Sequence, residues 1–178
     1  MINMFKNGFT LLEMIVAIGV FSVAILIAIS SFLNLEGIEK KVQAGLEVQT
    51  NLRFALEIMA KEIRTGTSYH CSLSPGIEPV SCPSGLGSFS FKNAGGAVII
   101  YRLNAERIEK SSDGGSVFQP LTASNIKVEN LKFYAVGAET GDDIQPRVLI
   151  NMKASSPTRS GENAFGFQTM VSQRKPAP

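Results

Sequence analysis

Histidine and cysteine are scarce in this sequence, which has one histidine, His70, and two cysteines among its 178 residues. A structural zinc site takes four ligands of these types, which the chain cannot supply. His70 precedes Cys71 directly, and adjacent residues rarely point at each other, so a catalytic Cys-His dyad is not favoured. The segment Gly85-Leu86-Gly87 lacks the third glycine and the lysine of a phosphate-binding loop. We therefore expect no catalytic residues, no metal, no cofactor and no small-molecule substrate.

Clusters of like charge are also missing. The chain has 17 Lys and Arg residues against 15 Asp and Glu, a net charge of +2, and the two signs are mixed along the sequence. A nucleic-acid-binding protein gathers Lys and Arg on one face, so nucleic acid is not an expected partner. Glu139, Asp142 and Asp143 could bind calcium through oxygen atoms, but their spacing fits no EF-hand. A solvated acidic turn is the simpler interpretation.

The N-terminal third lacks both charge and proline over long stretches. No charged residue occurs from Met14 to Leu35, and no proline occurs from Met1 to Tyr69. As a helix, residues 14–35 would be about 33 Å long, enough to cross the hydrocarbon core of a bilayer, about 30 Å. One carboxylate, Glu13, lies near the start of this apolar segment. Because an unpaired carboxylate in hydrocarbon is costly, Glu13 is expected to have a partner.

Two ordinary explanations of this N-terminus remain open. A secretory signal has an apolar region of 7–15 residues and an Ala-x-Ala-like cleavage site, for which Ala28-Ile29-Ser30 is a loose candidate. The apolar run is longer than that and continues past Ser30 through Phe32 and Leu33. A plain single-pass anchor explains the length of the run but not Glu13 or the glycine before it.

The segment Gly8-Phe9-Thr10-Leu11-Leu12-Glu13 resembles the prepilin-type signal of type IV pilins and type II secretion pseudopilins. The resemblance implies that residues 1–8 are a leader, which prepilin peptidase removes between Gly8 and Phe9, and that the new N-terminus is methylated. It also implies an inner-membrane protein that spans the membrane once, with its C-terminal domain on the extracytoplasmic side, until it joins a pilus or pseudopilus. Its partners would be other subunits, contacted through the N-terminal helix and Glu13.

The helix is expected to continue beyond the apolar segment and to end near Gly66. Apolar residues recur at steps of three and four, with one longer gap, as on one face of a helix. These residues are Leu35, Ile38, Val42, Leu46, Leu52, Leu56, Met59 and Ile63. The pattern permits a single helix from Phe9 to Arg64, about 84 Å long. Residues 51–64 resemble, loosely, the outer helix of W-type minor pilins and J-type minor pseudopilins.

From Ala97 onward the apolar period changes to two, which indicates β-strands. The expected strands are Ala97–Leu103, Glu106–Ser111, Ile126–Val136, Arg147–Ala154 and Phe165–Ser172, with a short one at Ser88–Lys92. We expect a tight turn at Asn104-Ala105 and a bulge near Glu129-Asn130, where the apolar face changes sides. Residues 66–96 are otherwise expected to be a loop, as is Ser155–Asn163. The predicted fold is α+β: a long helix packed on an antiparallel sheet of four to six strands.

Cys71 and Cys82 lie beyond the apolar segment, in the predicted loop. If that segment delivers them to an oxidising compartment, a disulfide between them is the natural expectation. The alternative is a pair of free thiols.

The expected regions are a leader at 1–8, a membrane-spanning and assembly helix at 9–35, an amphipathic outer helix at 36–65 and a β-rich head at 66–178. The expected function is structural, as a minor pilin or minor pseudopilin. A membrane-anchored binding protein, an adhesin or DNA receptor, is the first alternative, for which an exposed aromatic or basic patch would be the sign. An anchored enzyme is the second, and a pocket with converging polar groups would indicate it.

Overall fold

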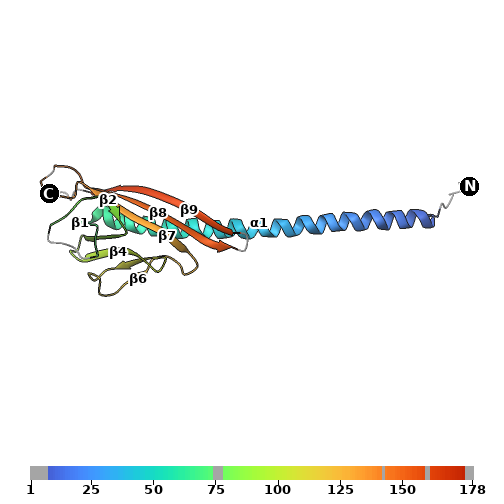
Figure 1. The fold of residues 1–178 in the computed structure, drawn as a ribbon, viewed down its shortest axis with the longest axis horizontal. Helices are drawn as coiled ribbons and strands as arrows, with labels where there is room; N and C mark the ends of the chain where they lie inside the picture. Colours follow the sequence, from blue (N-terminus) through green and yellow to red (C-terminus); the bar gives the residue numbers. More distant parts are fainter. Residues whose placement is uncertain (1–7, 74–77, 142, 159–160, 175–178) are drawn as a thin grey trace, which may run out of the picture. The chain divides into compact units, whose positions relative to one another are not determined.

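The computed structural model describes residues 8–73, 78–141, 143–158 and 161–174, and consists of one helix followed by nine strands (Figure 1). Helix α1 spans Leu11–Thr65. The chain divides into two compact units, up to Lys40 and from Lys41 on, which are described separately. The predicted helix from Phe9 to Arg64 is confirmed to within two residues at each end.

Helix α1 ends at Thr65, and the amide of the next residue, Gly66, donates to the Ile63 carbonyl at 3.0 Å. A Cβ atom at Gly66 would lie 2.4 Å from the ring of Phe91, so no larger residue fits there without displacing that ring. The chain then enters strand β1.

The strands form two antiparallel sheets rather than the single sheet that the sequence predicted. The first has the order β1-β3-β4-β5-β6 and the second the order β2-β7-β8-β9. The strands of the first sheet are β1 (Thr67–His70), β3 (Ser88–Lys92), β4 (Val98–Asn104), β5 (Arg107–Ser111) and β6 (Gln119–Pro120). Those of the second are β2 (Cys82–Leu86), β7 (Lys127–Val136), β8 (Arg147–Thr158) and β9 (Gly161–Ser172).

Two local features predicted for the strands, a tight turn and a bulge, are present in the structure. The β4–β5 turn is at Ala105-Glu106, one residue later than expected, and both residues have positive φ, 44° and 61°, as a type I′ hairpin turn requires. The register of β7 against β8 shifts between Val128 and Asn130, which confirms the predicted bulge.

Two predicted loops were wrong. Residues 66–96 include the short strands β1 and β2 in addition to the expected strand at Ser88–Lys92. The predicted loop Ser155–Asn163 is instead the distal part of the β8–β9 hairpin, paired out to Thr158 and Gly161. Residues 159 and 160 lie outside the described part.

The hydrophobic core of the second unit lies between the outer half of α1 and the two sheets. From the helix it includes Val48, Leu52, Ala55, Met59 and Ile63, all fully buried. From the sheets it includes the aromatic rings of Tyr69, Phe89, Phe91 and Phe133, which contact one another at centroid distances of 5.2–6.3 Å.

The predicted apolar stripe on α1 was correct only for its last part. Leu52, Met59 and Ile63 are buried, whereas Leu35, Ile38, Val42 and Leu46 are 55–62% exposed. The core face includes Val48 and Ala55, which the prediction omitted. The reason is the gap of six residues between Leu46 and Leu52, about 240° around a helix, which places the earlier and the later apolar residues on different faces of α1.

Candidate functional site: the start of helix α1

The first turn of α1 is closed by a reciprocal pair of hydrogen bonds between Thr10 and Glu13. The amide of Glu13 donates to Thr10 Oγ1 at 3.2 Å, and the amide of Thr10 donates to Glu13 Oε2 at 3.4 Å. This is a capping box, which satisfies two of the amides that a helix start leaves without partners. The Thr-x-x-Glu spacing is a known sequence signal for a capping box, and the predictions from the sequence did not include one.

The capping box uses only one oxygen of the Glu13 carboxylate. No described residue donates a hydrogen bond to the other oxygen, Oε1. Glu13 is also the acidic residue of the first helical turn, where a negative charge interacts favourably with the helix dipole. The side chain is therefore held in place within its own chain while one oxygen stays available to a partner.

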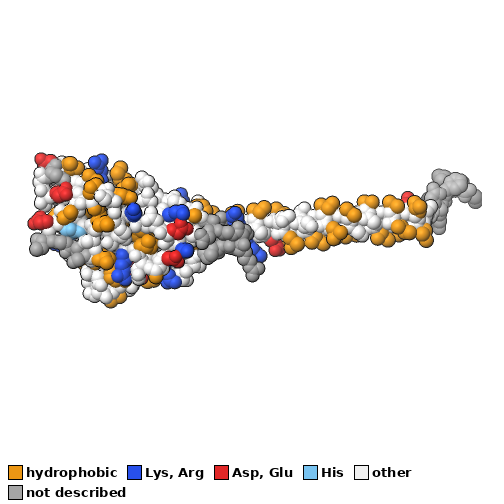
Figure 2. Space-filling view, viewed as in Figure 1, with side chains coloured by type: hydrophobic (Ala, Val, Ile, Leu, Met, Phe, Trp, Pro, Cys, Tyr) orange, Lys and Arg blue, Asp and Glu red, His pale blue; other side chains and the backbone are white. Residues whose placement is uncertain are grey.

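Beyond Glu13, the N-terminal half of α1 presents apolar side chains on every side. Every residue from Gly8 to Gln43 is exposed, and an 18-residue window of the helix has a mean hydropathy of 2.7 with none of it buried. Two of its few hydroxyls, those of Ser22 and Ser30, donate to the carbonyls of Ile18 and Leu26 in the preceding turn. An apolar surface of this size marks a membrane or a protein contact, and Figure 2 shows it in orange along the helix.

The predicted processing site lies directly before the capping box. Gly8 is exposed, and a Cβ atom added to it would have no neighbour within 4 Å. Phe9 is 79% exposed. The remainder of the predicted leader, residues 1–7, lies outside the described residues.

A comparison with known protein families finds a match on this segment. Residues 3–29 match the prokaryotic N-terminal methylation motif. The chain thus carries the motif of proteins made with a prepilin-type N-terminus, and this motif together with the long apolar helix is consistent with a type IV pilin-like protein. No curated protein and no solved structure matches the chain.

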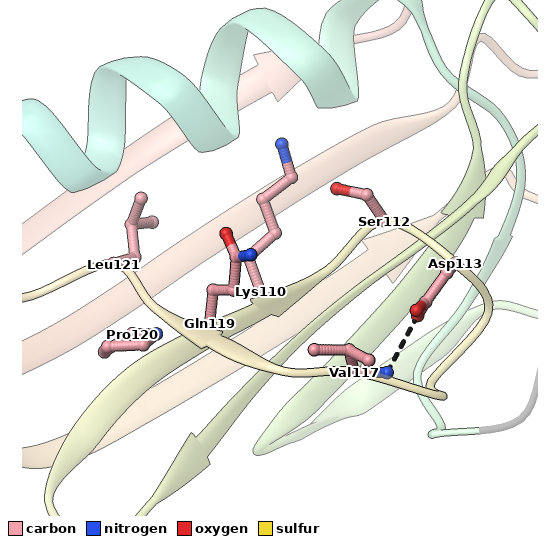
Figure 3. Close-up of a pocket in the computed structure, with 7 residues that line it drawn as sticks. All are labelled: Lys110, Ser112, Asp113, Val117, Gln119, Pro120 and Leu121. Carbon is pink, nitrogen blue, oxygen red and sulfur yellow. Dashed lines mark hydrogen bonds between the residues drawn. The ribbon is translucent and has the colours of Figure 1, made fainter.

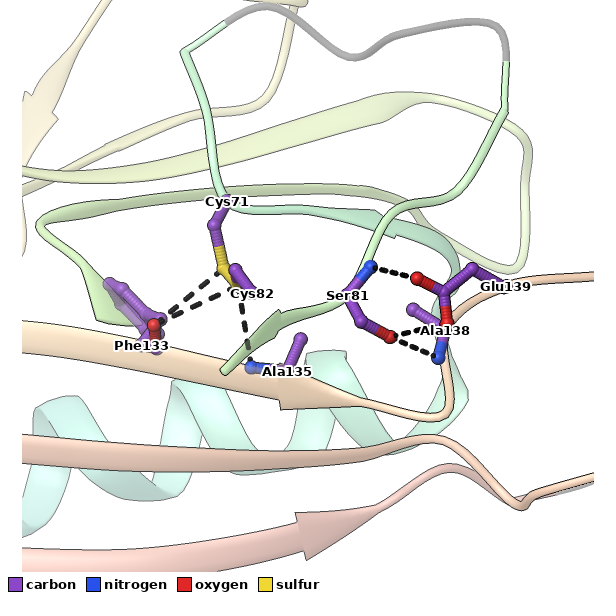
Figure 4. The surroundings of a disulfide bond; sticks show 7 residues. All are labelled: Cys71, Ser81, Cys82, Phe133, Ala135, Ala138 and Glu139. Carbon is purple, nitrogen blue, oxygen red and sulfur yellow. Dashed lines mark hydrogen bonds between the residues drawn. A yellow bond between two sulfur atoms is a disulfide. The ribbon is translucent and has the colours of Figure 1, made fainter. Parts of the chain in front are cut away.

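Beyond α1, Cys71 and Cys82 form the expected disulfide, with Cα atoms 6.1 Å apart (Figure 4). The bond joins the end of β1 to the start of β2, strands that belong to different sheets. Nearby, the amide of Ala135 donates to Cys82 Sγ at 3.4 Å, and the Ser81 hydroxyl donates to Glu139 at 2.9 Å. The disulfide therefore fixes the connection between the sheets where the sequence is rich in Gly, Ser and Pro.

We predict that a Cys71→Ala/Cys82→Ala protein keeps its fold but loses stability. The bond closes a loop with a sequence separation of 11. Chain entropy for a loop of that size suggests a loss of about 3 kcal/mol in the free energy of unfolding. Urea titration of the full chain in detergent, followed by circular dichroism, measures this change. Wild-type protein with reductant is the control and should lose a similar amount; a double variant as stable as the oxidised protein would contradict the prediction.

His70 does not form a catalytic dyad in this structure. Its neighbour Cys71 has its sulfur in the disulfide, and the imidazole is 4% exposed with no hydrogen-bond partner at Nε2 among the described residues. Burial, and then the nearby charge of Lys92, lower the pKa of His70 below its usual value, so the ring is held neutral. His70 is thus an enclosed, neutral imidazole at the end of strand β1, directly before the disulfide-bonded Cys71.

A depression of about 340 Å³ lies beside β6 and is lined by Lys110, Ser112, Asp113, Val117, Gln119, Pro120 and Leu121, the residues drawn in Figure 3. Its charged groups are engaged within the protein. Lys110 Nζ lies 2.5 Å from Glu62 Oε1, and Asp113 Oδ1 accepts from the Ser111 hydroxyl at 2.6 Å and from the Val117 amide at 3.0 Å. The Ser111 hydrogen bond and those from the loop amides lower the pKa of Asp113. These polar groups stabilise the loop and do not converge on a ligand.

The described residues contain no group of three His, Cys, Asp or Glu side chains placed to hold a metal ion. Asp142, one of the three acidic residues considered for calcium, lies outside them. Glu139 accepts hydrogen bonds from Ser81, and Asp143 has a positive φ of 52° in the same loop.

Proposed function

We propose that this protein is a minor subunit, a minor pilin or minor pseudopilin, of a type IV pilus or type II secretion filament. The observation that carries the proposal is the methylation motif at residues 3–29, which overlaps the exposed apolar part of α1, a helix that begins with the capping box of Thr10 and Glu13. The motif indicates a structural class of proteins. The subunit enters the filament through α1, and its head remains accessible.

In this proposal the N-terminal half of α1 has two successive environments. It anchors the protein in the inner membrane as a single span with the head on the extracytoplasmic side, and it then packs against other subunits in the filament. Because lipid and neighbouring helices are equally apolar, the hydrophobic effect contributes little to that transfer, and packing and polar pairing must favour assembly. Glu13 is the only charged residue between Phe9 and Leu35, so it is the residue we assign to that pairing.

The test is the intact mass of the protein recovered from membranes of cells that contain a prepilin peptidase. We expect a mass that lacks residues 1–8 and carries one additional methyl group on Phe9. Cells without the peptidase provide the control and should give the full-length mass. A mature N-terminus at Met1 in peptidase-containing cells, or one near Ser31, would contradict the proposal.

A further inference from the structure

The sheet β2-β7-β8-β9 has two faces of different character. Its inner face packs on the hydrophobic core through buried side chains such as Phe133, Ile150 and Val171. Successive side chains of a strand point to opposite faces, so the residues between these point outward. They are the even-numbered residues of 130–136 in β7, the odd-numbered residues of 147–153 in β8 and the even-numbered residues of 166–172 in β9, and all of them are exposed or half-buried. We call this set the outer face.

An apolar strip crosses the outer face. The register sets Tyr134 of β7 opposite Leu149 of β8, and Leu149 opposite Met170 of β9. A Cβ atom on Gly85 of β2 would overlap the Tyr134 ring, so that ring continues the strip over the fourth strand. Opposed side chains on neighbouring strands contact one another, so the strip is continuous. Met170, at the β9 end of the strip, is 61% exposed.

A cation flanks the apolar strip on each side. Lys132 lies two residues before Tyr134 in β7, and Arg147 lies two residues before Leu149 in β8. Because β7 and β8 are antiparallel, the two cations lie on opposite sides of the strip, in rows about 14 Å apart. Both are exposed, and neither has an ion-pair partner among the described residues.

The carboxylate that lies nearest to these cations in the sequence is already paired. Glu129, at the bulge of β7, forms an ion pair with Lys153 of the outer face at 2.5 Å. The charges of Lys132 and Arg147 therefore remain uncompensated within the described part of the chain. Two like charges on either side of an apolar strip complement a partner that carries negative charge on either side of an apolar group.

We propose that the outer face binds an acidic segment of another protein. Two carboxylates of that segment pair with Lys132 and Arg147, and an apolar side chain between them packs on Leu149 and Met170. The apolar strip supplies the buried area, and the two charge pairs set the choice of partner and its orientation. Tyrosine and arginine are the residue types that most often dominate binding energy in protein interfaces, and the outer face presents Tyr134 and Arg147 side by side with the strip.

The same charges disfavour two other occupants. A twofold pairing of two copies through the outer face would bring the same surface of each together, and so would place Lys132 and Arg147 of one copy close to those of the other. Nucleic acid carries one phosphate about every 3.4 Å along each strand, which two cations about 14 Å apart do not match. Leu149 and Met170, which lie between the cationic rows, offer nothing to a phosphate.

The test is site-specific photo-cross-linking of the full chain in membranes of the cells in which it occurs. The amino acid p-benzoylphenylalanine replaces Met170, and mass spectrometry identifies what it joins. Val117 is the control position, because it is 57% exposed and lies outside the outer face. We expect the Met170 position to join a segment of a different protein that contains two or more Asp or Glu residues. The Val117 position should not join that segment.

A set of matched substitutions then tests the charges. The double variant Lys132→Glu/Arg147→Glu should lower the yield of this cross-link by about tenfold or more, because it sets like charges against each other. Lys132→Arg/Arg147→Lys keeps both charges and should keep the yield. Changing the acidic residues of the joined segment to lysine should restore the cross-link to the Glu double variant. Thermal unfolding followed by circular dichroism shows whether each variant is folded.

The proposal is overturned if the Met170 position joins nucleic acid, lipid or a second copy of this chain, if the joined segment lacks acidic residues, or if nothing is joined. It is also overturned if the folded Glu double variant gives the wild-type yield. None of these results bears on the proposed function, because the intact mass that tests it reports only on the N-terminus.

Discussion

A Glu13→Ala protein is expected to be cleaved after Gly8, to remain in the membrane and to be missing from assembled filaments. Cleavage would create a cationic amine on Phe9, about one helical turn from Glu13. Within a bundle of such helices, this amine or that of a neighbouring subunit can reach the Glu13 carboxylate in an environment of low dielectric constant. Removing one member of a buried ion pair leaves the other charge uncompensated, at a cost of about 3–5 kcal/mol. That cost corresponds to roughly a thousandfold loss in an association constant.

The capping box suggests a sharper version of the experiment. A capping box can have glutamine in place of glutamate at N3, the position of Glu13. Glu13→Gln therefore keeps an acceptor for the hydrogen bond that the Thr10 amide donates, and removes only the charge. If Glu13 acted mainly by capping α1, the Gln variant would assemble and the Ala variant would not. We expect both variants to be excluded from the filament, because the proposed role depends on the charge.

Insertion into the membrane should survive both substitutions, because each makes the segment less polar. Glu36→Ala is the matched control, since it removes a carboxylate from the same helix at a polar position close to Lys40, and it should assemble normally. The measurement is the amount of each protein in purified filaments relative to the amount in membranes. Recovery of Glu13→Ala in filaments at the wild-type level would show that the carboxylate is dispensable and solvated at the membrane surface.

The sequence predicted α1 well because two strong signals agree there. A proline-free stretch that is first apolar all round and then periodic specifies a helix, and Gly66 supplies its end. What it could not predict was which apolar residues are buried. Leu46 and Leu52 were assigned to one apolar stripe, yet one is 57% exposed and the other fully buried. They are six residues apart, about 240° around a helix, so only one of them can face the sheets. That difference depends on where the sheets cover the helix, which is a tertiary property.

The strands that were missed are held by tertiary contacts rather than by local preference. Strand β2 contains Pro83 and Gly85, both unfavourable in strands, and it is placed by the Cys71–Cys82 disulfide and by pairing with β7. The distal part of the β8–β9 hairpin is polar and lacks alternation, so its pairing follows from the register that its neighbours set. The capping box was a different kind of omission, because the Thr-x-x-Glu signal was present and local.

The roles of Gly8, Phe9 and Glu13 stay predictions, as do the boundaries of the leader and of the membrane-spanning region. The structure nevertheless makes them easier to test. A side chain at Gly8 would meet no described atom within 4 Å, so a substitution there changes interactions with other molecules more than it changes the fold. Glu13 also caps α1 through Thr10, and the choice of substitution must separate that role from a contact with a partner.

A Gly8→Val protein is expected to remain uncleaved and to accumulate as a full-length precursor in the membrane. A peptidase must bring its catalytic groups close to the backbone on both sides of the bond that it cuts, and a glycine permits this because it has no Cβ atom. A branched side chain at Gly8 would block that approach. Among the described residues, no atom lies within 4 Å of the Cβ position of Gly8, so the new side chain would meet none of them. A clash with the described part of the chain would therefore not account for a loss of processing.

The control for Gly8→Val is the same substitution at Gly19. Gly19 is likewise exposed and has no neighbour within 4 Å of its Cβ position, and it lies inside the apolar segment, where valine keeps the segment apolar. We expect the Gly19→Val protein to be processed as efficiently as wild type. Intact mass after co-expression with a prepilin peptidase distinguishes the two proteins, because only the precursor keeps residues 1–8. If Gly8→Val is cut at the wild-type rate, the residue before Phe9 does not specify the cleavage site. In that case the motif at residues 3–29 must act through the apolar helix and Glu13 alone.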